Sequence, residues 1–245
     1  MFMYTGDTAS HVHYCYDNSA VDYHTLTGTP QYTLTLKTST GVSSFTGGGT
    51  YSEGSKPTAT ATASTGYHLT KYAGTLYDGS GTSEWTGCSG KTSHSDTWTM
   101  NADRTITAYA EKNTYTLTFT KGTGVASVTG GGTYSHGDTA TAVATASTGY
   151  YLTQYSGTTY DGSGTDTWTE CSGKDSHTST WTMNANRTIT VSAAKKTFKL
   201  TISQGTGTTI TVKKGSTTLS NGATITYGDS LTITITANTG YNLTA

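Results

Sequence analysis

The sequence predicts a mostly β protein built from small modules that follow one another end to end. The main observation is an internal repeat, because residues 31–113 align with residues 114–196 without a gap, at an offset of 83 residues and with 56 identities. A third copy begins at Phe198. Repetition of this kind marks structural units that contact mainly their neighbours. The predicted divisions are an N-terminal segment that ends a preceding element (1–30), two complete modules (31–113 and 114–196) and an incomplete third module (197–245).

Composition is the second observation that favours β-structure. Thr occurs 61 times and Tyr 18 times, whereas Pro occurs twice, and β-branched and aromatic residues suit a pleated surface. Leu, Ile, Val and Phe together number only 30 of 245 residues, which would suggest disorder if the net charge were large. Because the net charge is −1, the composition indicates thin, Thr-coated sheets instead.

The first predicted strand of each module has alternating apolar and polar residues. The alternation spans Tyr32–Leu36 and returns at Tyr115–Phe119 and Phe198–Ile202. A period of two indicates a half-buried strand with its large residues facing inward. The next segment, Gly47–Tyr51, is expected to form a turn, since consecutive glycines supply positive φ angles.

The second half of each module predicts two more strands. Thr58–Ala63 alternates Thr with Ala, Trp98–Arg104 is expected to turn, and Thr105–Ala110 forms the last strand. In the third copy, apolar residues and threonines alternate most clearly over Leu231–Thr236, which predicts a strand. An additional hairpin around Lys213–Ser216 carries a Lys pair that discourages edge-to-edge pairing.

The order of these motifs resembles a known bacterial repeat. Tyr-Thr-Leu-Thr, a glycine-rich turn, a strand ending in Thr-Gly-Tyr, Trp-Thr-Met-Asn-Ala and a final Thr-Ile-Thr strand are similar to the divergent repeat related to the internalin B-repeat. The resemblance covers residues 31–245 and includes no catalytic motif. It implies tandem β-rich modules that act as stalks or adhesive segments on bacterial surface proteins or phage virions. Because the internalin repeat resembles a β-grasp module, the resemblance leaves a short helix in each unit as an alternative.

Charge and hydropathy restrict the partners and the location. With 14 basic and 15 acidic residues, the chain has no electrostatic footprint for nucleic acid or an anionic membrane. No apolar run approaches the roughly 20 residues of a membrane helix, and Met1–Asp7 lacks the pattern of a signal peptide. We expect no nucleic acid partner and no membrane span. The expected location is extracellular, on a bacterial cell surface or a phage virion, with neighbouring repeats and surface glycans or proteins of host or bacterium as partners.

The segments Tyr77–Asp96 and Tyr160–Ser179 are long insertions relative to that family and are where a binding function is expected. Under a carbohydrate-binding hypothesis, aromatic faces, Tyr72 among them, contact the sugar while Asp78 and loop hydroxyls form hydrogen bonds. The alternative is that Trp85 fills the module's own core. Exposure of the aromatic side chains distinguishes the two. The candidate ligand-binding residues are Tyr77, Asp78, Trp85, Tyr160, Asp161 and Trp168.

The cysteines of the two modules are predicted to be buried thiols that form no disulfide bond. Cys88 and Cys171 occupy the same position in successive copies, and one Cys per module argues against a disulfide framework. Both are expected to be buried as small apolar residues. Cys88 with His94 lacks the paired ligands of a zinc site.

Two other segments contain ligand-type residues for metals. Asp-Gly-Ser-Gly at Asp78 hints at calcium, but the full acidic pattern is missing and Glu84 has a Thr as its counterpart. In the leading segment His11, His13 and Cys15 alternate, so a strand would place them on one face, with Asp22 and His24 nearby. Because no complete four-ligand set is visible, we expect no metal and no cofactor.

The sequence contains no motif of an enzyme. His94, Ser95 and Asp96 are consecutive, so a strand would place neighbours on opposite faces and prevent a relay. Glycine-rich runs lie between predicted strands without a following helix, which leaves a nucleotide site unsupported. The predicted function is a non-enzymatic, extracellular tandem-repeat stalk or adhesin-type structural protein of a bacterial surface or phage virion. The alternative hypothesis is a carbohydrate-binding module that uses the insertions.

Overall fold

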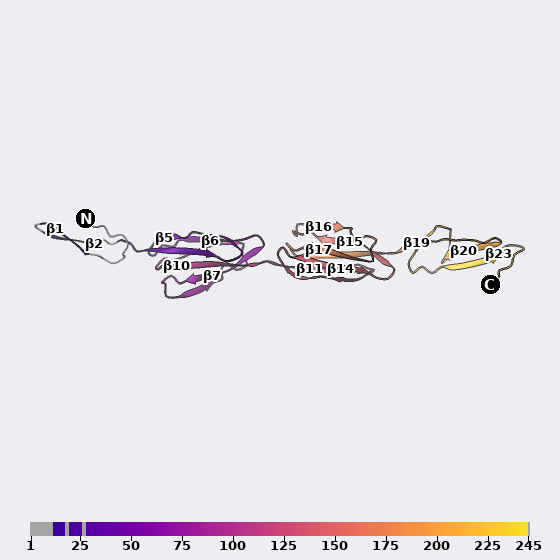
Figure 1. Ribbon diagram of the computed structural model, residues 1–245, viewed down its shortest axis with the longest axis horizontal. Coiled ribbons are helices and arrows are strands. Elements are labelled where there is room, and N and C mark those ends of the chain that lie inside the picture. Colours follow the sequence, from indigo (N-terminus) through magenta and orange to yellow (C-terminus); the bar gives the residue numbers. More distant parts are fainter. Residues whose placement is uncertain (1–11, 18–19, 26–27, 245) are drawn as a thin grey trace. The chain divides into compact units, whose positions relative to one another are not determined.

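The computed structural model describes residues 12–17, 20–25 and 28–244. The regular secondary structure in these ranges consists of β-strands (Figure 1). The predicted mostly β class with tandem small sheets is therefore confirmed. The short helix of a β-grasp unit is not found among the described residues. The chain forms two compact units, residues 1–113 and 114–245.

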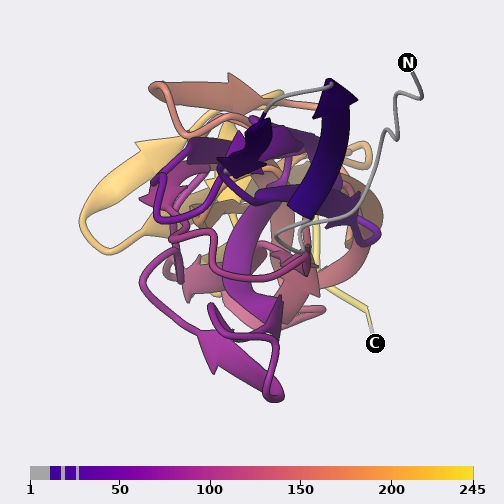
Figure 2. The same cartoon turned by 90° about the vertical axis from the view of Figure 1, so that its left-hand side faces the viewer.

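The first unit begins with a two-stranded antiparallel ribbon of β1 (Val12–Asp17) and β2 (Ala20–Thr25) (Figure 2). It continues with the first repeat, whose strands are β3 (Gln31–Thr38), β4 (Val42–Thr46), β5 (Gly49–Ser52), β6 (Thr58–Ala63), β7 (Tyr67–Thr75), β8 (Thr82–Trp85), β9 (Ser93–Thr97) and β10 (Arg104–Lys112). A five-stranded sheet has the order β5-β3-β10-β7-β8, and a three-stranded sheet has the order β4-β6-β9. Only β3 and β10 pair in parallel.

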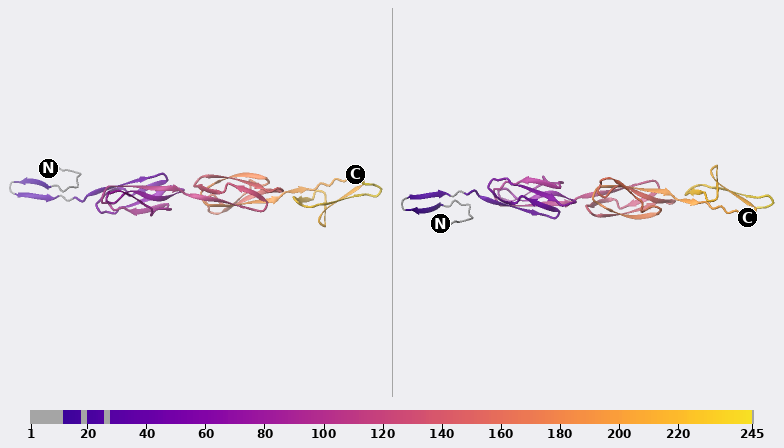
Figure 3. Two further views of the ribbon diagram at one scale, coloured as in Figure 1. Left: turned by 90° about the horizontal axis from the view of Figure 1, so that it is seen from below. Right: turned by 90° about the horizontal axis from the view of Figure 1, so that it is seen from above.

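The second repeat has the same topology (Figure 3). Its strands are β11 (Thr114–Lys121), β12 (Val125–Thr129), β13 (Gly132–Ser135), β14 (Thr139–Ala146), β15 (Tyr150–Thr158), β16 (Thr165–Trp168), β17 (Ser176–Thr182) and β18 (Arg187–Lys195). The five-stranded order is β13-β11-β18-β15-β16, and the three-stranded order is β12-β14-β17. Each complete repeat is thus a small sandwich with its core between the two sheets.

The core shows why so few large apolar residues are enough for a sandwich of this size. Leu34 on β3 and Ile106 on β10 are buried, and Ala59 and Ala61 on β6 face them from the other sheet. Small side chains on one sheet leave room for rings from the other, so Tyr72 on β7 is fully buried. The predicted alternation of large inward and polar outward residues is therefore present in the first repeat.

The third copy contains β19 (Thr197–Lys199), β20 (Thr208–Lys214), β21 (Thr217–Leu219), β22 (Thr224–Thr226) and β23 (Thr232–Ala237). They form a β19-β22 pair and a β21-β20-β23 sheet, and β20 with β21 is the predicted additional hairpin. Ile233 and Ile235 on β23 are 61% and 50% exposed. The large inward face predicted for Phe198–Ile202 is wrong, because β19 ends at Lys199 and Phe198 is 48% exposed.

Two details of the sequence-based prediction need correction. The predicted turn at 47–51 is shorter, because β5 begins at Gly49 and pairs with β3. The insertions at 77–96 and 160–179 are not simple loops, since each contributes one strand to the edge of each sheet. Hydroxyl-rich strands such as β9 lack the apolar alternation that makes a strand recognisable in a sequence.

Candidate functional site

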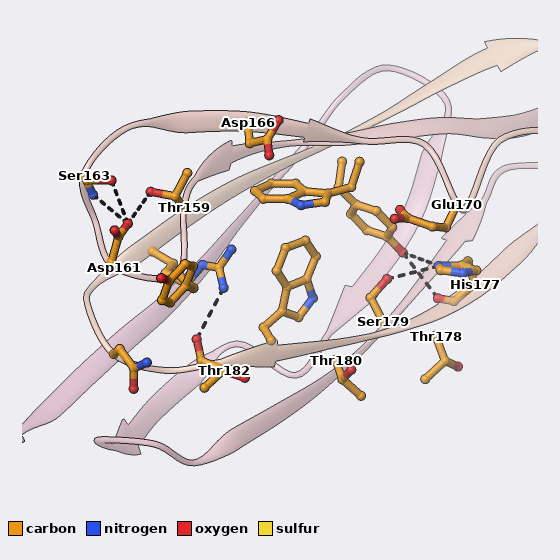
Figure 4. A pocket seen from close by; sticks show the side chains of 16 residues that line it. Thr159, Asp161, Ser163, Asp166, Glu170, His177, Thr178, Ser179, Thr180 and Thr182 are labelled. Atoms are coloured by element: carbon orange, nitrogen blue, oxygen red, sulfur yellow. Dashed lines mark hydrogen bonds between the residues drawn. The ribbon is translucent and has the colours of Figure 1, made fainter.

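The insertion of the second repeat lines a groove of about 880 Å³ between the edge strands β16 and β17. Aromatic, acidic and hydroxyl side chains share its surface. Figure 4 shows His177 and Ser179 on the inner side of β17, and Thr178 and Thr180 on its outer side. The groove, called here the aromatic groove, is lined principally by Tyr160, Asp161, Asp166, Trp168, Trp181 and Arg187.

Strand pairing positions the aromatic residues of the groove. Trp168 at the end of β16 lies opposite Tyr155 of β15 and packs, partly buried, against the core of the second repeat. Trp181 on β17 reaches the same region from the other sheet and is only 5% exposed. The two indole rings meet edge to face, with 4.9 Å between their centroids and an interplanar angle of 85°. This is the favoured geometry for an aromatic pair.

A buried arginine completes the groove floor. The guanidinium carbon of Arg187 lies 4.8 Å from the ring centroid of Trp181 and 5.6 Å from that of Trp168. Arg187 Nε donates to the Thr158 carbonyl at 3.0 Å, and Nη1 donates to the Thr182 carbonyl at 3.3 Å. Burial lowers the pKa of Arg187 from its usual value. The guanidinium therefore bonds to both sheets, to β15 through the Thr158 carbonyl and to β17 through the Thr182 carbonyl.

The first repeat holds the same arrangement. Trp85 and Trp98 meet at 4.9 Å and 82°, and the guanidinium carbon of Arg104 lies 5.1 Å from the Trp98 ring centroid. Arg104 Nε donates to the Thr75 carbonyl and Nη1 to the Thr99 carbonyl, each at 3.0 Å. Sequence reasoning missed both arginines. The available signal was an arginine directly before an alternating strand at the same place in both copies.

Tyr77 and Tyr160 form the outer rim of the two grooves, and Asp161 lines the second groove whereas Asp78 does not line the first. Tyr77 is 52% exposed and Tyr160 is 59% exposed. The Asp161 carboxylate accepts hydrogen bonds from the Ser163 backbone, the Ser163 hydroxyl and the Thr159 hydroxyl, which lower its pKa to about 2. Asp78 is held in the same way by the backbone and hydroxyl of one serine. One oxygen of each carboxylate thus fixes its own turn.

The structure separates the predicted aromatic residues into three environments. Tyr72 is fully buried, and its hydroxyl donates to the His94 carbonyl at 2.9 Å, so it is not an available sugar platform. Trp85 and Trp168 are half-buried and pack against the cores of their own repeats. Only Tyr77 and Tyr160 are largely exposed. The exposure criterion therefore favours core packing for the tryptophans and availability for the rim tyrosines.

The two grooves differ in size and charge. The first-repeat groove measures about 460 Å³ and includes Lys56 and Asp96 in its lining. The second-repeat groove includes Asp161, Asp166 and Glu170. At the offset of 83 residues, the positions of Asp166 and Glu170 are Ser and Gly in the first repeat. The same scaffold therefore presents a more acidic groove in the second repeat.

Cys88 and Cys171 are buried free thiols, as predicted from the sequence. Burial raises the pKa of both Cys88 and Cys171 above the ordinary thiol value. Among the described side chains, no group of three or more His, Cys, Asp or Glu residues is arranged to hold a metal ion. At Asp78, where the sequence hinted at calcium, the carboxylate accepts from the Ser80 backbone N–H and hydroxyl and so forms an Asx turn.

Fold and groove together define a tandem β-sandwich repeat protein. The comparison with family profiles finds the divergent InlB B-repeat domain at residues 32–114 and again at 115–196. These matches cover more than half of the chain, which therefore belongs to the divergent InlB B-repeat family. The resemblance inferred from the sequence motifs is confirmed.

The other comparisons add no relative. Neither the curated proteins nor the solved structures include a significant match to the chain. No helix among the described residues is long and apolar enough to cross a membrane.

Proposed function

We propose that this chain is a non-enzymatic spacer, a stalk or adhesin-type structural segment exposed on a bacterial cell surface or a phage virion. Membership in a family of tandem surface repeats supports the coarse function. Many exposed threonines on the strands keep a repeated sandwich hydrated without charge. Repeated grooves would add weak contacts through effective concentration when neighbouring repeats meet one surface.

The observation that carries this proposal is the joint between the second and third repeats. The Lys196 N–H donates to the Gly149 carbonyl at 2.8 Å, and the Lys196 carbonyl accepts from the Tyr227 N–H at 2.8 Å. The Tyr227 ring packs on Gly149 so closely that a Cβ there would lie 2.0 Å from the ring. The connecting residue is therefore bonded to both repeats, as a spacer with little freedom at its joints requires.

Small-angle scattering tests the spacer proposal. We would insert one or two additional copies of residues 114–196 after Lys196 and measure the maximum dimension of each chain. A spacer with fixed joints gives the same increase for every added copy. An increase that shrinks with each copy, as for modules that fold back on one another, would overturn the proposal.

The surface and virion locations are distinguished by the reading frame around this sequence. A signal sequence upstream or a wall-sorting tail downstream would support the bacterial surface. Capsid or tail segments adjoining the repeats would support the virion.

Carbohydrate binding is the second candidate function, and the aromatic groove is the observation that favours it. Its exposed Tyr160 offers an apolar face, while carboxylates and hydroxyls of the lining offer hydrogen bonds, a combination that suits a sugar ring. The partners would be glycans of a host or bacterial surface. The candidate residues remain Tyr77, Asp78 and Trp85 in the first repeat and Tyr160, Asp161 and Trp168 in the second.

Replacing the rim tyrosines tests this candidate without removing a core residue. The full chain and a Tyr77→Ala/Tyr160→Ala variant would be compared on a glycan array. Tyr109→Ala is the matched control, because Tyr109 is an exposed tyrosine outside both grooves. Loss of a glycan signal in the double variant alone supports the groove. A signal that survives the double variant, or no signal from the parent chain, rejects it.

A further inference from the structure

The first and last strands of each complete repeat are neighbours in the five-stranded sheet and run in parallel. In the second repeat β11 pairs with β18, and the register joins residues 117–121 to residues 187–191. In the first repeat β3 pairs with β10 in the same way, over residues 34–38 and 104–108. Each pair therefore joins the segment through which the chain enters a repeat to the segment through which it leaves.

The parallel direction places the entry and the exit of a repeat at opposite ends of the pair. The chain enters β11 at Thr114, ahead of the paired stretch, and leaves β18 at Lys195, beyond that stretch. Figure 3 shows the chain entering and leaving the second repeat at opposite ends. A pull transmitted through the chain therefore acts along the two strands and across the hydrogen bonds between them, a direction called here shear.

Shear loads the whole ladder at once. The hydrogen bonds of a parallel pair are evenly spaced along the strands. Because the two strands are drawn in opposite directions along their length, no bond of the ladder opens before its neighbours are also strained. The rate of forced unfolding is the rate of crossing the unfolding barrier. A transition state that must break several bonds together is therefore reached slowly.

Other strands hold both members of the pair in place. β18 also pairs with β15, which spans residues 150–158, and β11 also pairs with β13, which spans residues 132–135. The pair thus lies inside the sheet and not at its edge. Sliding either strand out of the sheet breaks two ladders and not one.

A buried arginine anchors the end of the last strand that the pull does not reach directly. Arg187 is the first residue of β18 and lies opposite Leu117. Its guanidinium donates to the Thr158 carbonyl at 3.0 Å and to the Thr182 carbonyl at 3.3 Å. Movement of β18 towards its exit would draw the guanidinium away from both carbonyls. Arg104 makes the equivalent bonds at the start of β10.

We propose that the parallel pair and its arginine form a mechanical clamp, which keeps each complete repeat folded when the chain is under tension. Such tension arises in the spacer proposed above, on whose function this inference rests, when a surface and a bound partner are drawn apart. The clamp is directional. It resists shear, whereas a pull that separates the ends of two antiparallel neighbours opens their ladder one bond after another, a direction called here peeling.

Force spectroscopy in two pulling directions tests the clamp in the full chain. Handles attached through Thr114→Cys and Lys195→Cys pull the second repeat in shear. Handles attached through Thr148→Cys and Lys195→Cys pull it in peeling, because Tyr150 at the start of β15 lies opposite Lys195. The three handle positions are exposed, so the substitutions leave the core unchanged.

The native cysteines do not compete for the handles. Cys88 and Cys171 are buried in the folded repeats, and a Cys15→Ser background removes the third thiol. Circular dichroism checks that every variant is folded before it is pulled.

We expect the second repeat to unfold at least about 10-fold more slowly in shear than in peeling at the same constant force, because shear breaks several hydrogen bonds together. Arg187→Lys should speed unfolding in shear by about 10-fold and in peeling by less, since peeling begins at the end of β18 far from this residue. An arginine that stabilised the fold without resisting sliding would speed both directions equally.

Equal unfolding rates in the two directions, or faster unfolding in shear, would overturn the clamp. Equal acceleration by Arg187→Lys in both directions would remove the arginine from it. If Arg187→Lys does not fold, the comparison of the two directions with the arginine in place still decides. Failure of the clamp is distinguishable from failure of the spacer, because the scattering measurement follows the length added per copy and applies no force.

Discussion

Arg187 lies against Trp181, with 4.8 Å between the guanidinium carbon and the ring centroid. Arg104 and Trp98 repeat this relationship in the first repeat at 5.1 Å. The arginine of each pair also donates to one carbonyl on the five-stranded sheet and to a second carbonyl at or just after the end of β9 or β17. In each sandwich one buried cation therefore contacts aromatic rings and backbone carbonyls together.

Replacing these arginines by lysine should destabilise both repeats. Lysine keeps the charge but lacks the planar fork that donates in two directions while stacking on an indole. For Arg104→Lys and Arg187→Lys we expect the free energy of unfolding to fall by about 1.5 to 3 kcal/mol per repeat, the range for hydrogen bonds that involve a charged group. Urea unfolding followed by tryptophan fluorescence measures the loss. The control is Lys195→Met, because Lys195 is an exposed cation on the same strand as Arg187. This substitution should change the free energy of unfolding little.

The joint between repeats can be tested at one glycine. Gly149 has a φ of +79°, and Gly137 has a φ of +80° with open space around it. Alanine at either position incurs similar backbone strain, but only Gly149→Ala displaces the Tyr227 ring. We expect the Tyr227 amide to exchange faster in Gly149→Ala than in Gly137→Ala, measured by hydrogen exchange. Equal exchange in the two variants would show that the ring contact does not hold the joint.

The buried thiols should resist alkylation in the folded chain. Burial raises the pKa of Cys88 and Cys171, so the reactive thiolate is scarce near neutral pH and access is blocked. In a Cys15→Ser background, iodoacetamide should modify both thiols only when denaturant is added, as mass spectrometry would show. Rapid modification of the native chain would mean that the cores open readily.

The turn at Asp161 should lose its order only in strong acid. The folded pKa is about 2, below the ordinary 3.8, so the stabilisation by this carboxylate is complete above 3.8 and disappears as the pH falls towards 2. Titration followed by NMR of the carboxyl carbon should give a midpoint near 2. Ser163→Ala should move it upward by removing one donor, whereas Ser80→Ala in the other repeat should leave it unchanged. A midpoint near 3.8 in the parent chain would refute the hydrogen bonds.

Much of the fold was predictable because the repeat and the alternating strands are local signals. The strands at Tyr32–Leu36, Thr58–Ala63 and Thr105–Ala110 all form. The parallel pairing of the first strand with the last was not predictable. It joins residues about 70 positions apart, and the residue pattern of a strand does not show which strand it pairs with. The edge strands in the insertions were missed because their residues are mostly polar on both faces.

The candidate site was predictable in composition but not in geometry. Repetition of Tyr77, Asp78 and Trp85 in the second copy drew attention to the insertions, which help to line the two grooves. It did not show that Tyr72 is inside the core or that Arg104 belongs to the groove, because those facts depend on how the two sheets face each other.

Single-molecule force spectroscopy tests the central claim, that the chain is a spacer of independently folded sandwiches, most directly. Each complete repeat has 83 residues, so its unfolding should release roughly 300 Å of chain at about 3.6 Å per residue, less the length of the folded module. Two events of equal size are expected when the full chain is pulled from its ends. One combined event, or extension without any unfolding step, would contradict the account.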